Sequence, residues 1–377
     1  MKKSLIFCAA LLASAFAFQS CDKVDNPTGE PLEPTKAVID NGSDLKDVIA
    51  KFAKDGVLTL PAEVELTLNE EIELTNPLTI VGDEKKPATI IAKAGFTTNA
   101  GLILQNLKID ATELTKPLIQ MGDTTGTGLL NKVIFAGVEG YSNINQNAWV
   151  LNNPIKIENC IIKDLPSQIF FANKYDWAVD EFTLNNNIIQ LNNDNQKAFI
   201  DMEGSKCAII KNLNITNNSI YNIKDVKDKF FVKGSNASNT QPKKIYGTTA
   251  ADTYKWNISN NTMIKTFNKK AFANNTPSIN TVTITLKNNI FVDVLQIQKI
   301  FGNCKKDIDK ASNFIWGTEG FIIDNTDKGT YCTELVAAPF EVPAAALDLT
   351  VERGGLNLTA TGDAANAGDP RWIANAQ

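Results

Sequence analysis

Leu184-Asn185-Asn186-Asn187-Ile188-Ile189 decides the fold, because close copies of this stretch recur before and after it. In each copy apolar residues flank asparagine, as in Ile157-Glu158-Asn159-Cys160-Ile161-Ile162. The marking asparagines lie 25 to 43 residues apart, and a period of this length is typical of a solenoid, propeller or array. They are Asn106, Asn131, Asn159, Asn186, Asn217, Asn260 and Asn288.

Each copy predicts a strand, a tight bend and a second strand. Apolar and polar residues alternate with the period of two that indicates a strand. Asparagine then interrupts the strand, because it tolerates the left-handed backbone that a tight bend needs. No helical period occurs in the array. We expect the asparagine side chains to bond to one another from coil to coil and to serve the scaffold.

A set of phenylalanines runs in step with the asparagines and predicts a second strand face in every coil. Each lies 11 to 14 residues after its asparagine. Stacked coils would place like residues about 4.8 Å apart, the spacing of neighbouring strands. We therefore predict an all-β fold, a parallel β-helix. It should be right-handed, because crossover connections between parallel strands are almost always right-handed. The phenylalanines expected to stack inside it are Phe170, Phe199, Phe231, Phe272 and Phe301.

The residues before the repeat predict a helical cap and the first coils. Ser43 to Phe52 has the pattern of a short amphipathic helix that Ser43 or Asp44 could cap. Such a helix would cover the open edge of the first coil. We assign residues 37–340 to the β-helix and 341–377 to a C-terminal segment that packs on it or closes it. Early strands are expected at Val57–Leu60, Val64–Leu68, Ile72–Leu74, Leu78–Val81 and Thr89–Ala92.

The first 36 residues carry a targeting signal and a linker. Two lysines at positions 2–3 precede an apolar run over residues 5–18 that is too short for a membrane span, and Cys21 follows. This arrangement resembles a bacterial lipoprotein signal, which implies that residues 1–20 are removed and that Cys21 is lipidated. Residues 21–36 contain three prolines and no apolar period, as a tether does.

The chain is acidic, which limits its partners. Its formal net charge is −5, and removal of a signal that holds two lysines and no acid brings it to −5 − 2 = −7. Such a chain binds phosphate backbones poorly, so we exclude nucleic acid as a partner. We expect membrane attachment through the lipid anchor, at the outer membrane, on the cell surface or on the periplasmic face.

The lipoprotein signal, the helical cap, the asparagine bends and the closing Gly368-Asp369-Pro370-Arg371-Trp372 resemble Bacteroidetes lipoproteins of the pectin-lyase-like right-handed parallel β-helix superfamily. The chain is similar to an uncharacterised branch that ends in this same segment. The resemblance covers residues 37–377. It implies the β-helix fold and the handling of polysaccharide at the cell surface, but fold alone does not set the chemistry.

The residue inventory argues against the reactions of that superfamily. The chain has no histidine, which is the commonest general acid or base and the commonest metal ligand. The resemblance implies paired aspartates with His, Arg and Lys for pectin hydrolysis, and no such set can be assembled. It implies an Arg or Lys base with Ca²⁺ for uronate lyases. The only arginines, Arg353 and Arg371, lie in the C-terminal tail, so a lyase would depend on lysine.

Five acidic residues from consecutive coils are the best candidates for a Ca²⁺ site, because Ca²⁺ prefers carboxylate ligands. The competing interpretation is that opposite charges pair on neighbouring strands, with Asp201 beside Lys233 and Glu203 beside Lys174. We favour the pairing and expect no cofactor, with Ca²⁺ as the alternative. The five residues are Asp176, Asp180, Glu181, Asp201 and Glu203.

Aromatic residues in or beside irregular loops, including an insertion at about residues 233–255, are candidates for a carbohydrate site. An exposed ring can stack on the apolar face of a sugar while polar neighbours bind its hydroxyls. For each ring the alternative is packing in the core or in a loop. The candidates are Trp149, Tyr175, Trp177, Tyr246, Tyr254 and Trp256.

The sequence therefore predicts a cell-surface lipoprotein that binds or presents polysaccharide and catalyses no reaction. Two alternatives stay open: a Ca²⁺-dependent polysaccharide lyase with a lysine base, and a structural or adhesion protein. We expect the functional site where the repeat is interrupted, around residues 141–149, 174–181 and 233–256.

Overall fold

In the computed structural model, the described strands all lie in the part of the chain that begins at Ile39. The signal, Cys21 and the tether lie outside the described residues, so their assignment stays a prediction. Within the described part of the chain, no helix is long and apolar enough to span a membrane. The described residues are 38–122, 149–172, 177–193, 198–202, 209–225, 231–233, 254–267, 272–273, 282–294, 306–317, 332–340 and 362–372.

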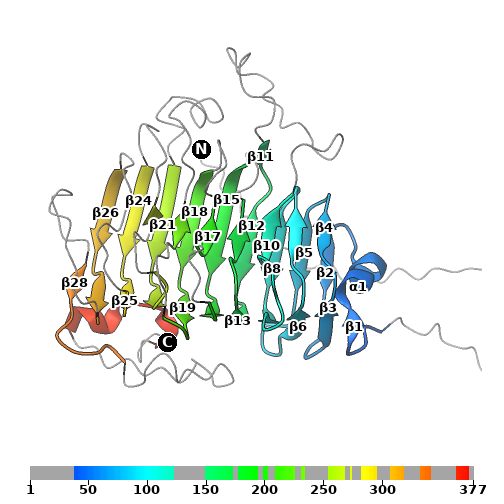
Figure 1. Ribbon diagram of the computed structural model, residues 1–377, viewed down its shortest axis with the longest axis horizontal. Coiled ribbons are helices and arrows are strands. Elements are labelled where there is room, and N and C mark those ends of the chain that lie inside the picture. The colour runs from blue at the N-terminus through cyan, green and yellow to red at the C-terminus, as the bar shows by residue number, and fades with distance from the viewer. Residues whose placement is uncertain are drawn as a thin grey trace, which may run out of the picture. The chain divides into compact units, whose positions relative to one another are not determined.

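The described strands form three parallel sheets that wind as a right-handed β-helix, which confirms the predicted fold (Figure 1). Coil after coil, the chain passes from sheet B to sheet A and then to sheet C.

Sheet A consists of β1 (Ser43–Asp44), β3 (Glu65–Leu68), β6 (Ala88–Ala92), β9 (Leu107–Asp110), β13 (Ile161–Leu165), β16 (Ile188–Leu191), β19 (Ser219–Asn222), β22 (Thr262–Ile264), β25 (Ile290–Val292), β27 (Phe314–Trp316) and β28 (Thr333–Glu334). Sheet B consists of β2 (Val57–Thr59), β5 (Leu78–Val81), β8 (Leu102–Gln105), β11 (Trp149–Leu151), β12 (Ile155–Glu158), β15 (Trp177–Asn185), β18 (Ile209–Thr216), β21 (Tyr254–Ser259), β24 (Val282–Lys287) and β26 (Lys306–Ala311). Sheet C consists of β4 (Ile72–Leu74), β7 (Phe96–Thr98), β10 (Ile119–Met121), β14 (Phe170–Phe171), β17 (Ile200–Asp201), β20 (Val232–Lys233) and β23 (Phe272–Ala273).

The predicted N-terminal helix is present as α1 (Leu45–Phe52). Asp44 is its N-cap, and the side chain of Asp44 accepts a hydrogen bond from the backbone N–H of Lys46 at 2.8 Å. The apolar face of α1 buries Leu45 and Val48 against the first coil. This burial explains why a helix of only two turns is stable, since tertiary packing supplies most helical stability in proteins.

From β8 to β25, each bend from sheet B to sheet A is made by an asparagine with a left-handed backbone. All six described members of the predicted asparagine set have φ between 54° and 58°. Their side chains form an outer ladder, in which Asn186 Nδ2 donates to Asn159 Oδ1 at 2.7 Å. At one rung Asn217 donates to Asn185 instead of Asn186. The predicted bonding from coil to coil is therefore confirmed, and Asn131 lies outside the described residues.

A second, fully buried set of asparagines follows the first by one residue. We call Asn187, Asn218, Asn261, Asn289 and Asn313 the inner asparagine ladder, and each is at most 2% exposed. Asn218 shows the pattern: its Nδ2 donates to Asn261 Oδ1 at 3.0 Å and to the Leu184 carbonyl at 2.9 Å. Its Oδ1 accepts from the backbone N–H and from Nδ2 of Asn187. Burial is possible because every amide is satisfied.

Cys160 occupies the first position of the inner ladder, where it is a small, fully buried residue inside the coil. Its backbone N–H donates to Asn187 Oδ1 at 2.9 Å. Its thiol donates to the Leu104 carbonyl at 3.6 Å, where asparagine would place an amide. At the other end Asn313 carries the ladder one coil beyond the last predicted asparagine, Asn288.

The phenylalanines do not form the single column that the sequence predicts. Phe170 is the register partner of Ile200, so it is offset by one residue from Phe199. Phe199 stacks on Phe231 with ring centroids 4.9 Å apart, whereas Phe170 packs on Phe182 of sheet B. The offset is tolerated because the consecutive residues Phe199 and Ile200 are both buried at this corner of sheet C. A shift of one residue therefore exposes no apolar side chain. Phe301 lies outside the described residues.

The C-terminal segment packs along the side of the coils. Its described part contains two 3-10 helices, η5 (Gly362–Asn366) and η6 (Pro370–Trp372). Ala364 and Ala367 cover an apolar cluster on the outer face of sheet A, formed by residues such as Tyr221 and Val292. Both faces of sheet A are therefore buried here, which accounts for the continuous apolar runs in its strands.

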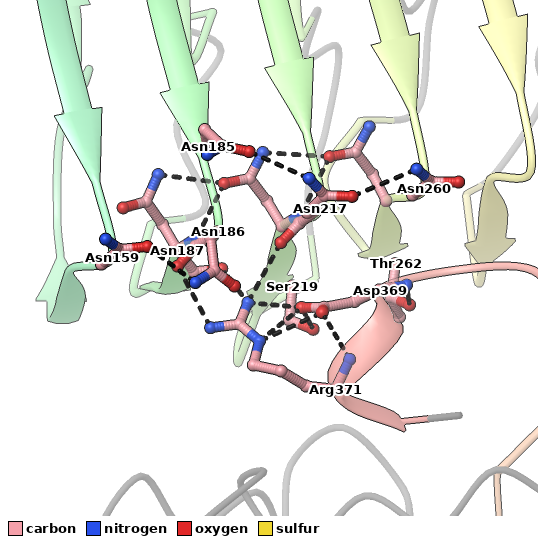
Figure 2. Close-up of polar contacts among 12 residues, drawn as sticks. Asn159, Asn185, Asn186, Asn187, Asn217, Ser219, Asn260, Thr262, Asp369 and Arg371 are labelled. Carbon is pink, nitrogen blue, oxygen red and sulfur yellow. Dashed lines mark hydrogen bonds and ion pairs between the residues drawn. The ribbon is translucent and has the colours of Figure 1, made fainter. Parts of the chain in front are cut away.

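Residues 368–372, which we call the C-terminal clasp, join three coils at the bends (Figure 2). Asp369 is fully buried, accepts a hydrogen bond from Ser219 Oγ at 2.8 Å and forms an ion pair with Arg371. Arg371 in turn donates to the backbone carbonyls of Asn187 at 2.6 Å and of Asn186 and Asn217 at 3.3 Å. Gly368 is required because its φ is +88° and a Cβ would lie 2.7 Å from Thr262 Oγ1.

We predict that Asn218→Ala destabilises the fold by roughly 2–4 kcal/mol, because it leaves the buried Asn187 N–H without its acceptor, at about 1–3 kcal/mol, and removes the side-chain hydrogen bond to the Leu184 carbonyl, at about 1 kcal/mol. The midpoint of urea unfolding measures this. Thr285→Ala, on the outer face of sheet B, is the control and should change stability by no more than about 0.5 kcal/mol. Equal midpoints for the two variants would contradict the role of the inner ladder.

We predict that Arg371→Ala destabilises the fold by about 3 kcal/mol, because it leaves the buried Asp369 carboxylate without its cation. Arg371→Lys should recover only part of the loss, since an ammonium group cannot reproduce the planar fork that contacts three carbonyls. Urea unfolding, together with the rate of proteolysis after residue 340, provides the measurement. Wild-type behaviour of Arg371→Ala would show that the clasp is dispensable.

We predict that Cys160 and Cys332 resist alkylation in the folded protein. Burial raises the pKa of both thiols to about 12, so almost no reactive thiolate is present at pH 8. Iodoacetamide labelling followed by peptide mass spectrometry should find both residues unmodified in buffer and modified in denaturant. Rapid labelling of either residue in buffer would mean that its coil opens readily.

Candidate functional site

The outer face of sheet B is the candidate site, because the outer face of sheet A from β16 to β27 is covered. Along β21 and β24, and along β15 and β18 after a break in the register before Glu181 and Asn212, core residues alternate with residues on the outer side of the sheet. Phe182, Leu213 and Ile284 point into the core, and their neighbours in sequence point outward. The outward residues align from strand to strand, because the four strands are parallel and in register.

Two outward rows cross these strands. In the first row Glu181 is aligned with Asn212, Lys255 and Thr283. In the second row Thr183 is aligned with Asn214, Asn257 and Thr285. The rows border a pocket of about 530 Å³ whose lining residues are Glu181, Asn212, Asn214, Lys255, Trp256, Asn257, Thr283 and Thr285.

One end of the pocket is organised by a hydrogen-bonded network around Glu181. Lys156 Nζ lies 2.8 Å from Glu181 Oε1, and both side chains are about one-third exposed or less. Thr183 Oγ1 donates to the same carboxylate oxygen at 3.1 Å. Asn214 Nδ2 then donates to Thr183 Oγ1 at 3.2 Å. The carboxylate is thus compensated and held in place.

The other end of the pocket has unused hydrogen-bonding capacity. Within the described part of the chain, the side chains of Lys255, Thr283 and Thr285 have no hydrogen-bond or ion-pair partner. Asn257 Oδ1 accepts from Ser259 Oγ at 2.6 Å, which orients the amide and leaves its Nδ2 available as a donor. This end of the pocket can therefore bind hydroxyl groups or other small polar groups.

Of the six aromatic candidates, the structure describes the side chain of Trp256 and places Trp149, Trp177 and Tyr254 by their strands. Trp256 is 4% exposed, and its indole N–H donates to the Ile210 carbonyl at 3.1 Å, so its ring lies in the core beneath the pocket. Trp149 and Trp177 are register partners on β11 and β15, which places them at one level of neighbouring strands. Tyr254 begins β21, and Tyr175 and Tyr246 lie outside the described residues.

The acidic candidates are separated by the sheets. Asp180 and Glu181 belong to β15 in sheet B, whereas Asp201 is buried on β17 in sheet C. Asp176 and Glu203 lie outside the described residues. Across the described ranges, no three His, Cys, Asp or Glu side chains lie close enough to hold a metal ion.

Asp201 is the register partner of Lys233, as the charge-pairing interpretation predicts. Lys174, which that interpretation places beside Glu203, lies outside the described residues together with Glu203.

The sequence prediction missed the amides and hydroxyls of the pocket. A signal for them exists in three strands, Asn212-Leu213-Asn214, Lys255-Trp256-Asn257 and Thr283-Ile284-Thr285, where amides and hydroxyls alternate with apolar residues. Outward positions of this kind are usually occupied by solvated charges. A concentration of neutral polar side chains in successive coils is therefore a usable indication of a binding face.

Residues 64–223 match a family model described as a domain of unknown function, DUF4957. No curated protein and no solved structure gave a significant match to the chain. The matched range runs from the first coils to just past β19, and with the parallel sheets it agrees with a β-helix. It includes Glu181, Asn212 and Asn214 of the pocket but neither β21 nor β24.

Proposed function

We propose that this protein is an exported lipoprotein whose β-helix binds polysaccharide without acting on it, and that the pocket on the outer face of sheet B is the binding site. The observation that carries the proposal is the alignment of Asn214, Asn257 and Thr285 across neighbouring strands, with hydrogen-bonding capacity left over. Carbohydrate sites need such polar groups at fixed positions on a rigid surface, and the inner asparagine ladder makes the surface rigid.

Attachment to the membrane through a lipid on Cys21 is part of the same proposal. It is supported by the basic and apolar start of the chain, by Cys21 and by the proline-containing residues 21–36. Together with the β-helix and the clasp sequence, these features support membership among Bacteroidetes-type lipoproteins of the pectin-lyase-like superfamily. A lipid on Cys21 would place the binding face at the surface of the outer membrane, where polysaccharide is presented.

We predict that the mature chain, carrying Cys21→Ser so that it stays free of lipid, binds members of a panel of plant, algal and host glycans. In isothermal titration calorimetry, Asn214→Ala and Asn257→Ala should each weaken binding about tenfold, the equivalent of one hydrogen bond of about 1–1.5 kcal/mol. Lys108→Ala, an exposed change on β9 of sheet A, is the control. The proposal fails if no glycan binds, or if all three variants bind as the wild type does.

The same panel separates binding from catalysis. Lys255 is the one lysine that lines the described pocket, so it is the residue that a lyase would use as its base. A lyase acting on uronate polymers would raise ultraviolet absorbance through unsaturated ends, and a chelator would abolish the rise if Ca²⁺ took part. We expect no rise with any polymer. A rise that Lys255→Gln removes would replace binding by catalysis as the function.

A further inference from the structure

The charges of the pocket nearly cancel, which limits the class of glycan that it can take. Glu181 is compensated by Lys156 at 2.8 Å and by the Thr183 hydroxyl, so it presents no free negative charge. Lys255 is the remaining charged residue of the lining, and it is exposed on the surface of β21. A single exposed ammonium group in water contributes little to binding, because solvent and salt screen it.

Apart from Trp256, the rest of the lining consists of amides and hydroxyls, which can both donate and accept hydrogen bonds. Asn212, Asn214 and Asn257 each carry two donors and one acceptor oxygen, and each threonine carries one donor and one acceptor oxygen. A sugar hydroxyl has the same dual character, so these groups match it in either direction. A carboxylate or sulfate only accepts, and its recognition normally depends on arginine or on several lysines.

The geometry selects a linear ligand. The two rows cross β15, β18, β21 and β24 at right angles to the strands, so equivalent polar groups recur about every 4.8 Å in the direction in which the coils stack. A linear ligand lying in this direction meets one residue of each row, and so a pair of polar groups, at each coil. The whole protein is also acidic, at −5 before and −7 after loss of the signal, and would repel a polyanion approaching it.

We infer that the pocket takes a neutral, hydroxyl-rich glycan chain that lies across β15, β18, β21 and β24. This inference rests on the proposed function and narrows it to uncharged polysaccharide. Asn214, Asn257, Thr283 and Thr285 bind ring hydroxyls from successive coils. Lys255 contacts the same chain as a hydrogen-bond donor, and its charge is not needed.

The test compares neutral and acidic oligosaccharides of one length with the mature Cys21→Ser chain. Calorimetry at 50 and 500 mM NaCl would use galactohexaose, xylohexaose, cellohexaose and mannohexaose as neutral probes and hexagalacturonate as the acidic probe. At least one neutral hexaose should bind, with an affinity that changes less than twofold between the two salt concentrations. Its disaccharide should bind at least tenfold more weakly, because it spans too few strands.

Matched variants identify the groups responsible. Lys255→Gln keeps a donor and removes the charge, so the neutral hexaose should bind within about threefold of the wild type. Asn257→Ala combined with Thr285→Ala should weaken binding at least tenfold while the circular dichroism spectrum and the urea midpoint stay unchanged. If that double variant proves unstable, Asn257→Asp, which keeps the shape and removes two donors, provides the same comparison.

Two results would overturn the inference, and only the second would also overturn the proposed function. Binding of hexagalacturonate alone, with a loss of more than tenfold at high salt and in Lys255→Gln, would show an acidic ligand and leave polysaccharide binding as the function. Failure of every neutral and acidic oligosaccharide to bind would remove the proposed function together with the inference.

Discussion

The inner asparagine ladder is the interaction on which the rest of the structure depends. Each coil must turn from sheet B to sheet A inside a dry core, where an unpaired backbone group costs about 1–3 kcal/mol. An asparagine side chain supplies a donor and an acceptor at one point, so each coil satisfies the coil before it and the coil after it. The coils from β15 to β27 therefore repeat the same bend, and their strands are brought into register as a result.

That register has consequences on both outer faces. On sheet A the strands carry apolar residues on both sides, so the coils from β16 onward need a cover. The C-terminal segment provides it, and Arg371 binds carbonyls of the same bends that the ladder creates. The bends are therefore held from inside by asparagine and from outside by arginine. On sheet B the register aligns outward amides and hydroxyls into rows, and the described part of the chain leaves this face open at the pocket.

The pocket presents mostly neutral polar groups. Its carboxylate is tied to Lys156 and Thr183, and most of its lining is neutral. Neutral groups at fixed spacing recognise shape and hydroxyl pattern, whereas acid and base catalysis needs titratable groups with matched pKa values. The same rigidity that maintains the fold thus favours recognition of a repeating ligand.

The sequence by itself determined the coil, because its period, its left-handed asparagine bends and the Asp44 cap are local properties of the chain. Only the tertiary structure decided where a ligand could bind. Asn214 and Asn257 are 43 residues apart and become neighbours through strand register alone. From the sequence, Trp256 could be either an exposed ring or a core residue, and the structure shows its indole N–H donating to the Ile210 carbonyl inside the core. Which sheet face remained open depended on where the C-terminal segment packed, and packing between distant segments has no local signature in a sequence.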